Sequence, residues 1–201
     1  QDIAARRSLF MPVNRSVPDV AQKRKNWNGL ISGFKASDLV FLDGSGCNTD
    51  MTRRYAYSLG GSRAVDFAPL PKPKNTTILS SIQLDGTLRY TTFSGGTTVE
   101  RFKRYLETDL LPHLNGNSVL IMDDMKSHHA KAVRNLLDSS GVRYIYLPPY
   151  SPDLNPIEKL WSKVKSFLRK FKARTLDALP NAIQNAFHSV TISDCSGLSL
   201  I

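Results

Sequence analysis

Two short apolar runs, each followed at once by an aspartate, constrain the fold of this chain more than any other feature. Residues 39–42 read Leu-Val-Phe-Leu before Asp43, and residues 118–122 read Ser-Val-Leu-Ile-Met before Asp123. Apolar runs of this length are typical of strands that are buried in a sheet. If the two strands lie side by side, their carboxyl ends bring both aspartates to one edge. The sequence therefore predicts a pair of acids at one edge of a sheet.

The segments around these runs predict one α/β domain. Further strands are expected over residues 53–58, 76–83, 88–93 and 143–147. Helices are expected over residues 20–30, from Thr97 or Thr98 to 111, over 127–139, and from Asn155-Pro156 to Phe171. The order strand, helix, strand over 118–147 implies a parallel pair, whereas the Asp85-Gly86 turn implies an antiparallel hairpin.

Small residues and prolines mark where elements are expected to end. Gly44, Ser45 and Gly46 should break the first strand directly after its aspartate. Residues 68–75 contain three prolines and are expected to form a surface loop. In the last long helix Trp161 belongs to the apolar face by its spacing, which favours a place in the core.

Three acids can supply a metal site. Magnesium prefers carboxylate, phosphate and water oxygens, so phosphodiester cleavage by metal needs such ligands to converge. Asp43 and Asp123 stand at strand ends, and Glu158 stands at the start of a helix. A cluster of this kind can hold two ions roughly 3.5 to 4 Å apart, one activating water or a DNA 3′ hydroxyl and the other stabilising the leaving oxygen.

Each acid also has a purely structural interpretation. Asp43 could form an Asx turn with the residues that follow it. Asp123 and Asp124 could begin a helix as its cap and first-turn acid. Glu158 is the third residue after Asn155, so it could complete a capping box. Taken singly, the acids leave both interpretations open.

Longer motifs favour the metal site over these structural interpretations. Residues 147–161, Leu-Pro-Pro-Tyr-Ser-Pro-Asp-Leu-Asn-Pro-Ile-Glu-Lys-Leu-Trp, closely resemble the block that carries the last catalytic carboxylate in transposases of the mariner superfamily, particularly its bacterial insertion-sequence branch. Residues 121–128 resemble the second block, in which Asp123 and His128 match. Positions 124–157, 34 residues, separate the two acids, an interval typical of that superfamily. Residues 39–46, with Arg53 and Arg54 further on, resemble the first block, so the resemblance spans roughly residues 18–190.

The resemblance implies a ribonuclease-H-like fold, with a central mixed sheet flanked by helices. It also implies cut-and-paste transposition of an insertion sequence, in which Asp43, Asp123 and Glu158 hold Mg²⁺ or Mn²⁺, with two ions expected. His128, Asp124 and Asn155 are expected to support these ligands or to contact DNA. The implied partners are double-stranded DNA, both transposon ends and target, and a second copy of the chain in a homodimer on DNA.

Two residues depart from the family pattern. Members commonly carry glutamate where this chain has Gly44, and asparagine where it has Asp124. The glutamate is not one of the three ligands, so its loss should tune metal binding without abolishing it. The extra charge of Asp124 could raise the pKa of a neighbouring carboxylate or attract metal more strongly.

Charge favours a polyanionic partner. Lys and Arg number 27 against 17 Asp and Glu, which gives a net charge of +10 and favours binding to phosphates. The expected DNA contacts are basic residues of the last long helix and of the segment after the first block: Lys159, Lys163, Lys165, Arg169, Arg53 and Arg54. The alternative is that the helical ones form the solvated face of an amphipathic helix.

The expected organisation has three parts: a basic linker or strap over residues 1–37, a DDE catalytic domain over 38–190, and a C-terminal tail over 191–201 that ends abruptly. Relatives carry an N-terminal helix-turn-helix region, for which the first 37 residues leave no room, and a chain that opens on Gln1 suggests a fragment.

Cys47 and Cys195 are expected to be reduced thiols. Without a membrane-length apolar run or a signal-peptide pattern, the expected location is the cytoplasm, at the nucleoid of a bacterial cell.

Two other functions compete with an active transposase core. The Gly44 departure and the short N-terminal region also suit a catalytically impaired, DNA-binding remnant of a decayed element. A host nuclease on the same fold, such as a ribonuclease H or a resolvase, is disfavoured by the Pro-Pro-Tyr-Ser-Pro string at residues 148–152.

Overall fold

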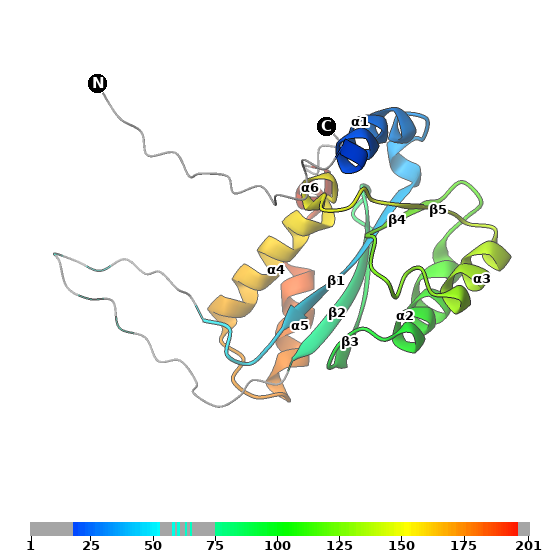
Figure 1. Ribbon diagram of the computed structural model, residues 1–201. Coiled ribbons are helices and arrows are strands. Elements are labelled where there is room, and N and C mark those ends of the chain that lie inside the picture. Colours follow the sequence, from blue (N-terminus) through cyan, green and yellow to red (C-terminus); the bar gives the residue numbers. More distant parts are fainter. Residues whose placement is uncertain are drawn as a thin grey trace, which may run out of the picture.

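A mixed five-stranded sheet forms the centre of the computed structural model, which describes residues 18–52, 58, 60, 63, 65 and 75–196 (Figure 1). The strands lie in the order β3-β2-β1-β4-β5. Their bounds are Leu39–Cys47 for β1, Thr76–Gln83 for β2, Leu88–Ser94 for β3, Val119–Met122 for β4 and Arg143–Tyr146 for β5. Most of the strand expected over 53–58, together with most of the expected loop over 68–75, falls outside the described residues.

Strand directions follow the prediction. β1, β2 and β3 pair antiparallel, and β4 pairs parallel with both β1 and β5. The hairpin between β2 and β3 turns at Gly86, whose φ of 91° suits glycine, while Asp85 accepts a hydrogen bond of 2.7 Å from the Thr87 amide. The two apolar runs are therefore neighbours, with Leu42 beside Met122 in the parallel register.

The first strand is longer than expected. Gly44, Ser45 and Gly46 do not end β1; they continue it to Cys47, each paired with a residue of β2. Glycine has a low strand propensity, but the adjacent β2 backbone supplies a full ladder and outweighs it. Pairing with β4 stops one residue before Asp43, whereas pairing with β2 runs on past it. Asp43 therefore lies where the sheet opens between β1 and β4.

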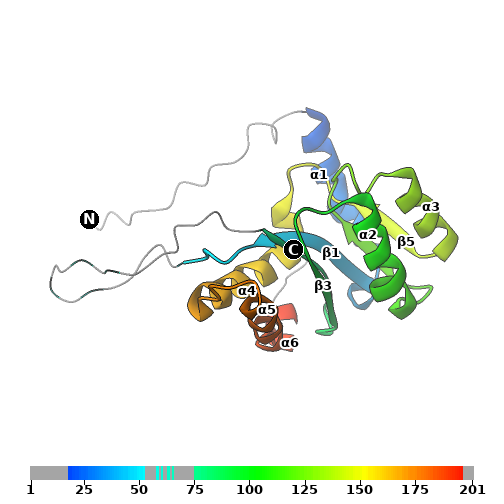
Figure 2. The same ribbon diagram turned by 90° about the horizontal axis from the view of Figure 1, so that it is seen from below.

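Helices cover both faces of the sheet (Figures 1 and 2). On one face α2 (Val99–Tyr105) and α3 (Lys131–Ser140) pack on Val40, Leu42, Leu120 and Met122. On the other face α4 (Ile157–Phe171) and α5 (Ala178–His188) pack on Leu39, Phe41, Val119 and Ile121. Alternate residues of β1 and β4 thus serve opposite layers, as the two-residue period of a strand requires.

Several helix ends differ from the prediction. Thr98 caps α2 as expected, its hydroxyl accepting from the Arg101 amide at 3.3 Å, but the helix passes into a π turn at Leu106–Leu110 and a 3₁₀ turn at Leu111–His113. α3 begins at Lys131, later than the predicted 127, because residues 126–129 form a turn in which His128 and His129 contact Asp123 and Asp124. The apolar residues of α4 are mostly buried, namely Ile157, Leu160, Trp161, Val164 and Leu168, whereas Phe167 is half-buried and Phe171 is exposed.

The segments at either end of the described chain also pack on the α4 layer. α1 (Pro18–Ile31) follows the predicted helix and buries Trp27 and Ile31 in that cluster, and short 3₁₀ turns follow at Ala36–Asp38 and later at Pro152–Leu154. The expected tail contains a helix that the sequence pattern did not reveal, α6 (Ile192–Ser196), which buries Cys195. Both cysteines are free and buried, in line with the expected thiols. Within the described parts of the chain, no helix is both long and apolar enough to cross a bilayer.

Candidate active site

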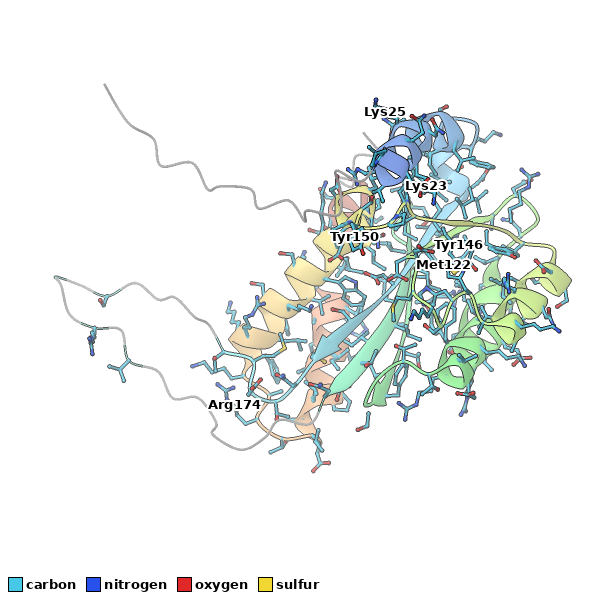
Figure 3. All side chains as sticks on the ribbon, viewed as in Figure 1. Lys23, Lys25, Met122, Tyr146, Tyr150 and Arg174 are labelled. Carbon is cyan, nitrogen blue, oxygen red and sulfur yellow. The ribbon has the colours of Figure 1, made fainter. Side chains whose placement is uncertain are left out.

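The three predicted acids line one cavity of about 600 Å³. Asp43 and Asp123 are the residues that follow the last parallel pair, Leu42 and Met122, and Glu158 comes from the first turn of α4. The cavity wall is completed by Val20 of α1, by Asp124 and Met125, and by the loop of residues 147–152 with Asn155. Figure 3 shows Tyr150 of this loop below the helix that carries Lys23 and Lys25.

Asp43 is buried and held at both oxygens. The Gly44 amide donates to Oδ1 at 2.7 Å, and the Trp161 indole donates to Oδ2 at 3.0 Å. Burial raises the pKa of Asp43 to about 6, and the charges of Asp123 and Glu158 add to that effect, whereas the two hydrogen bonds oppose it. The alternative interpretation, in which Asp43 ends the strand in an Asx turn, is wrong, because β1 continues through this residue.

Asp123 is half-exposed and contacts a buried histidine. Nδ1 of His128 lies 2.7 Å from Asp123 Oδ1 and 3.2 Å from its backbone oxygen, and the ring stacks on Phe102 with centroids 4.0 Å apart. His128 is only 1% exposed. The structure therefore brings His128 to Asp123 and keeps its ring away from the surface.

Asp124 faces a second histidine. Its Oδ1 pairs with Nε2 of His129, whose ring stacks on Tyr146. The ring of His129 is partly exposed but has these two specific contacts. Neither Asp123 nor Asp124 caps a helix, since the cap position of α3 is Ala130.

Glu158 lies at the start of α4 but does not complete a capping box. The Glu158 amide donates to the backbone oxygen of Asn155 at 3.1 Å, and the cap position, Pro156, has no side-chain hydrogen bond. Although Glu158 is exposed overall, partial burial raises its pKa; Lys165 opposes this and Asp123 adds to it. Asn155 is 5% exposed, and its Oδ1 finds no hydrogen-bond partner among the described atoms.

The carboxylate and amide oxygens of the cavity are of the type that binds a hard divalent cation, but they do not converge on one point. Among the described residues, no group of three or more His, Cys, Asp or Glu side chains has a geometry that could hold a metal ion. Three carboxylates and the unpartnered oxygen of Asn155 nevertheless line the same cavity, and these are the oxygens that Mg²⁺ and Mn²⁺ prefer. The charge of Asp123 raises the pKa of both other acids, so mutual repulsion opposes a closed cluster without a cation.

The departure at position 44 lies on the opposite face of β1 from the acids. A Cβ added to Gly44 would lie 3.1 Å from a methyl group of Leu79 and 3.8 Å from the hydroxyl of Thr97, both on the α2 side of the sheet. A side chain at this position would therefore point away from Asp43, whose carboxylate faces α4.

The basic residues of α4 fall into two groups. Lys159, Lys163 and Lys170 line an open groove of about 540 Å³ together with Ser162, Ser166, Phe167 and Ser189. Burial raises the pKa of both Glu158 and Cys47, and the nearby charge of Lys165 opposes that rise in each case. Arg169 is one turn further along the helix. Arg53 and Arg54 lie outside the described residues.

Two contacts of the site were missed by sequence reasoning. Trp161 was expected only in the core, yet it donates to Asp43; the signal was available, since a buried indole N–H needs an acceptor. Arg24 of α1 donates to both carboxylate oxygens of Asp153, at 3.2 and 2.6 Å, and also to Ser151. Nothing in the sequence spacing links these residues, which are more than a hundred positions apart.

Comparison with known proteins shows the family of the chain. Residues 38–180 match the family described as DDE superfamily endonuclease. A stretch of 97 residues, 46% of this chain, is 29% identical to the transposable element Tc1 transposase of Caenorhabditis elegans and covers 36% of that protein. The match therefore spans about a third of the Tc1 transposase.

Solved structures share the fold. The crystal structure of the Mos1 mariner paired end complex with Mn superposes with a TM-score of 0.81 at 18% identity, covering 97% of this chain and 62% of the Mos1 chain. The catalytic domain of Mos1 mariner transposase superposes with a TM-score of 0.71 at 16% identity, covering 94% and 90%. The predicted ribonuclease-H-like fold is confirmed. Because the family match extends over well more than half of the 201 residues, this chain belongs to the DDE superfamily endonucleases.

Proposed function

We propose that this chain is the catalytic core of a DNA transposase of the bacterial insertion-sequence branch of the mariner superfamily. In this proposal Asp43, Asp123 and Glu158 hold two Mg²⁺ or Mn²⁺ ions, which when bound would activate the attacking oxygen and stabilise the leaving one. One observation carries the proposal: three acids from distant segments line a single cavity at the point where β1 and β4 separate. Mn²⁺-dependent nicking of supercoiled DNA tests it.

The protein's own groups have distinct roles in this site. Gly44 and Trp161 fix the carboxylate of Asp43, and His128 orients that of Asp123. The free Oδ1 of Asn155 is an acceptor for a water in the cavity. Asp124 adds negative charge at the rim, although its carboxylate is turned to His129.

The wider assignments belong to the same proposal. Residues 38–190 form the DDE catalytic domain, residues 1–37 a strap and residues 191–201 a tail. Two copies act as a homodimer on transposon ends and target DNA, at the bacterial nucleoid. Support comes from related complexes: one solved Mos1 structure is a pre-cleavage transpososome and another is a strand transfer complex.

We assign DNA backbone contacts to the groove of Lys159, Lys163 and Lys170 and, on the site side of α4, to Lys165 and Arg169; Arg53 and Arg54 remain candidates. The groove places three cations beside three serine hydroxyls, and such groups bind phosphate without reading base sequence. The salt bridge of Lys163 to Asp194 ties one of these cations to α6.

Replacing Lys159, Lys163 and Lys170 together by Gln should lower the salt dependence of DNA binding. Each lost phosphate contact reduces the slope of log affinity against log salt by about 1, so the slope should fall by about 2 to 3. Fluorescence anisotropy with duplex DNA at several salt concentrations measures this. Lys131→Gln, on the α3 side of the sheet, is the control and should keep the wild-type slope. If the triple variant keeps the wild-type slope, the lysines of the groove do not contact the DNA backbone.

The raised pKa of Asp43 predicts a pH-dependent stability in metal-free protein. The folded state holds the Asp43 proton more tightly than the unfolded state, in which the pKa is near 3.8, so this residue stabilises the fold at low pH. That stability is lost as pH rises from about 4 to about 6, and a difference of two pKa units corresponds to roughly 3 kcal/mol.

Urea denaturation with a chelator, compared between wild type and Asp43→Asn, isolates this contribution from all other titrating groups. The unfolding free energy of the variant should gain roughly 2 kcal/mol relative to wild type between pH 4 and pH 7, because part of the total is already lost at pH 4. A constant difference in unfolding free energy between Asp43→Asn and wild type over this pH range would contradict the prediction.

A further inference from the structure

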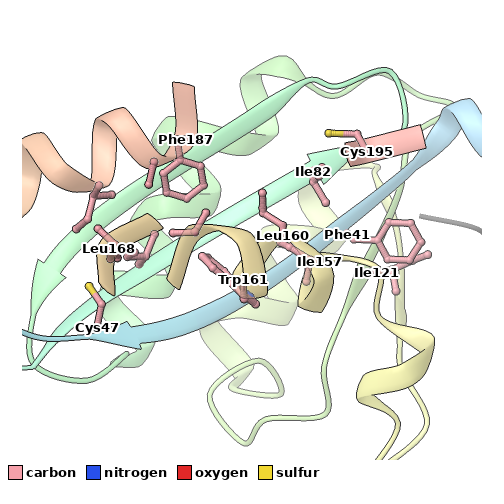
Figure 4. Packing of buried hydrophobic residues seen from close by; sticks show 14 of the residues in the cluster. Phe41, Cys47, Ile82, Ile121, Ile157, Leu160, Trp161, Leu168, Phe187 and Cys195 are labelled. Atoms are coloured by element: carbon pink, nitrogen blue, oxygen red, sulfur yellow. The ribbon is translucent and has the colours of Figure 1, made fainter. Parts of the chain in front are cut away.

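We propose that Trp161 is a positioning residue that holds the carboxylate of Asp43 in the orientation needed for metal binding, an inference that rests on the proposed function. The indole Nε1 lies 3.0 Å from Asp43 Oδ2. Trp161 is 3% exposed and Asp43 is 8% exposed, so water cannot readily replace either partner. Figure 4 shows Trp161 extending from α4 toward β1 among the residues of the core.

The hydrogen bonds leave room for a cation. An ionised carboxylate has about four lone-pair positions on its two oxygens. The Gly44 amide uses one on Oδ1 and the Trp161 indole uses one on Oδ2. Both oxygens therefore retain a free lone pair while the carboxylate as a whole is fixed at two points.

Trp161 itself is held rigidly. It packs in the cluster that includes Phe41, Ile157 and Leu160, and its ring meets that of Phe187 edge-on, with centroids 6.3 Å apart. Rotation of the indole away from Asp43 would need this core to open. Because the indole of Trp161 has so little freedom to move, its hydrogen bond also restricts the carboxylate of Asp43.

The helix α4 therefore positions two of the three acids, Glu158 and Asp43. Glu158 and Trp161 are three residues apart, and such residues are neighbours on a helix surface. The first turns of α4 thus carry one acid directly and fix a second, on β1, through the indole. The distance between the carboxylates of Asp43 and Glu158 therefore depends on the position of α4, which moves as a rigid body.

The test replaces the donor without changing its shape. Trp161→Phe removes the N–H but keeps an aromatic ring, and substitution by benzothienylalanine keeps the two-ring shape with sulfur in place of N–H. Groups that orient metal ligands typically contribute 10- to 100-fold to metal affinity. Calorimetric titration with Mn²⁺ alone should therefore give a dissociation constant 10- to 100-fold higher for both variants. In nicking assays the Mn²⁺ concentration for half-maximal rate should rise by the same factor, with a smaller change at saturation.

The matched control is Trp27→Phe, which makes the same substitution at the other tryptophan, a buried residue of α1 that does not line the cavity of the three acids. It should bind Mn²⁺ within about twofold of wild type. With two tryptophans in the chain, the indole N–H signals are also readily followed by NMR, and Asp43→Asn should shift that of Trp161. Near-wild-type Mn²⁺ affinity in the benzothienylalanine variant would overturn the proposal, even if Trp161→Phe failed to fold.

The same titration separates this inference from the proposed function. If Asp123→Asn binds Mn²⁺ as tightly as wild type, the metal site itself is wrongly assigned. If Asp123→Asn loses Mn²⁺ binding while both Trp161 variants keep it, the site stands and only the positioning role of Trp161 is wrong.

Discussion

Asp123→Asn should lower Mn²⁺-dependent nicking of supercoiled DNA by about a thousandfold or more. Asp123 stands at the end of β4, beside the point where β1 leaves the parallel ladder, and its charge acts on both Asp43 and Glu158. Metal ions stabilise the transition state by several kcal/mol, and each 1.36 kcal/mol corresponds to a factor of ten in rate. Asparagine keeps the size of the side chain and an oxygen for His128, so the loss should come from charge.

The control for this variant is Asp177→Asn, which removes an equal charge from an exposed position before α5 and should nick at the wild-type rate. Far-ultraviolet circular dichroism should be unchanged in both proteins. Cleavage that persists in Asp123→Asn would refute the assigned triad. Salt-dependent DNA binding without cleavage in the wild type would favour the impaired remnant over an active core.

Phe41→Ala should destabilise the protein by about 3 to 5 kcal/mol, the cost of removing a buried phenyl ring. Phe41 is fully buried between the sheet and α4, on the same face of β1 as Asp43. The ring contributes to the cluster that seats Ile157 and Trp161, so its loss opens a cavity directly under the first turns of α4. For a chain of this size the melting temperature should fall by about 10 °C.

Phe171→Ala is the matched control, since the same residue type at the end of α4 is 45% exposed. Phe171→Ala should lower the unfolding free energy by no more than about 1 kcal/mol, mostly because the stacking of Phe171 on Phe167 is lost. Urea denaturation measures both changes. If the two variants lost equal unfolding free energy, the result would contradict the difference in burial between Phe41 and Phe171.

The sheet and the grouping of the acids were predictable because they follow from local patterns. The apolar runs before Asp43 and Asp123 are short and nearly continuous, as buried parallel strands require, and β1 and β4 are indeed neighbours. The helix after Asn155 was equally clear, because its apolar residues recur at helical spacing and five of them are buried.

Contacts between distant segments could not be predicted. The extension of β1 through three small residues depends on the ladder that β2 supplies. The delayed start of α3 depends on histidines that contact Asp123 and Asp124. The bonds from Trp161 to Asp43 and from Arg24 to Asp153 join residues with no common spacing or motif. In each case tertiary structure supplies a partner that local propensity does not encode.

Positions 43 and 44 are adjacent in sequence but belong to different layers. The carboxylate of Asp43 meets α4, whereas a side chain at 44 would meet Leu79 and Thr97. Exchange of glutamate for glycine at position 44 therefore changes the packing beneath α2 and leaves the number of acids in the cavity the same. The two neighbouring residues of this motif therefore meet different structural constraints, position 43 from the acids of the cavity and position 44 from the packing beneath α2.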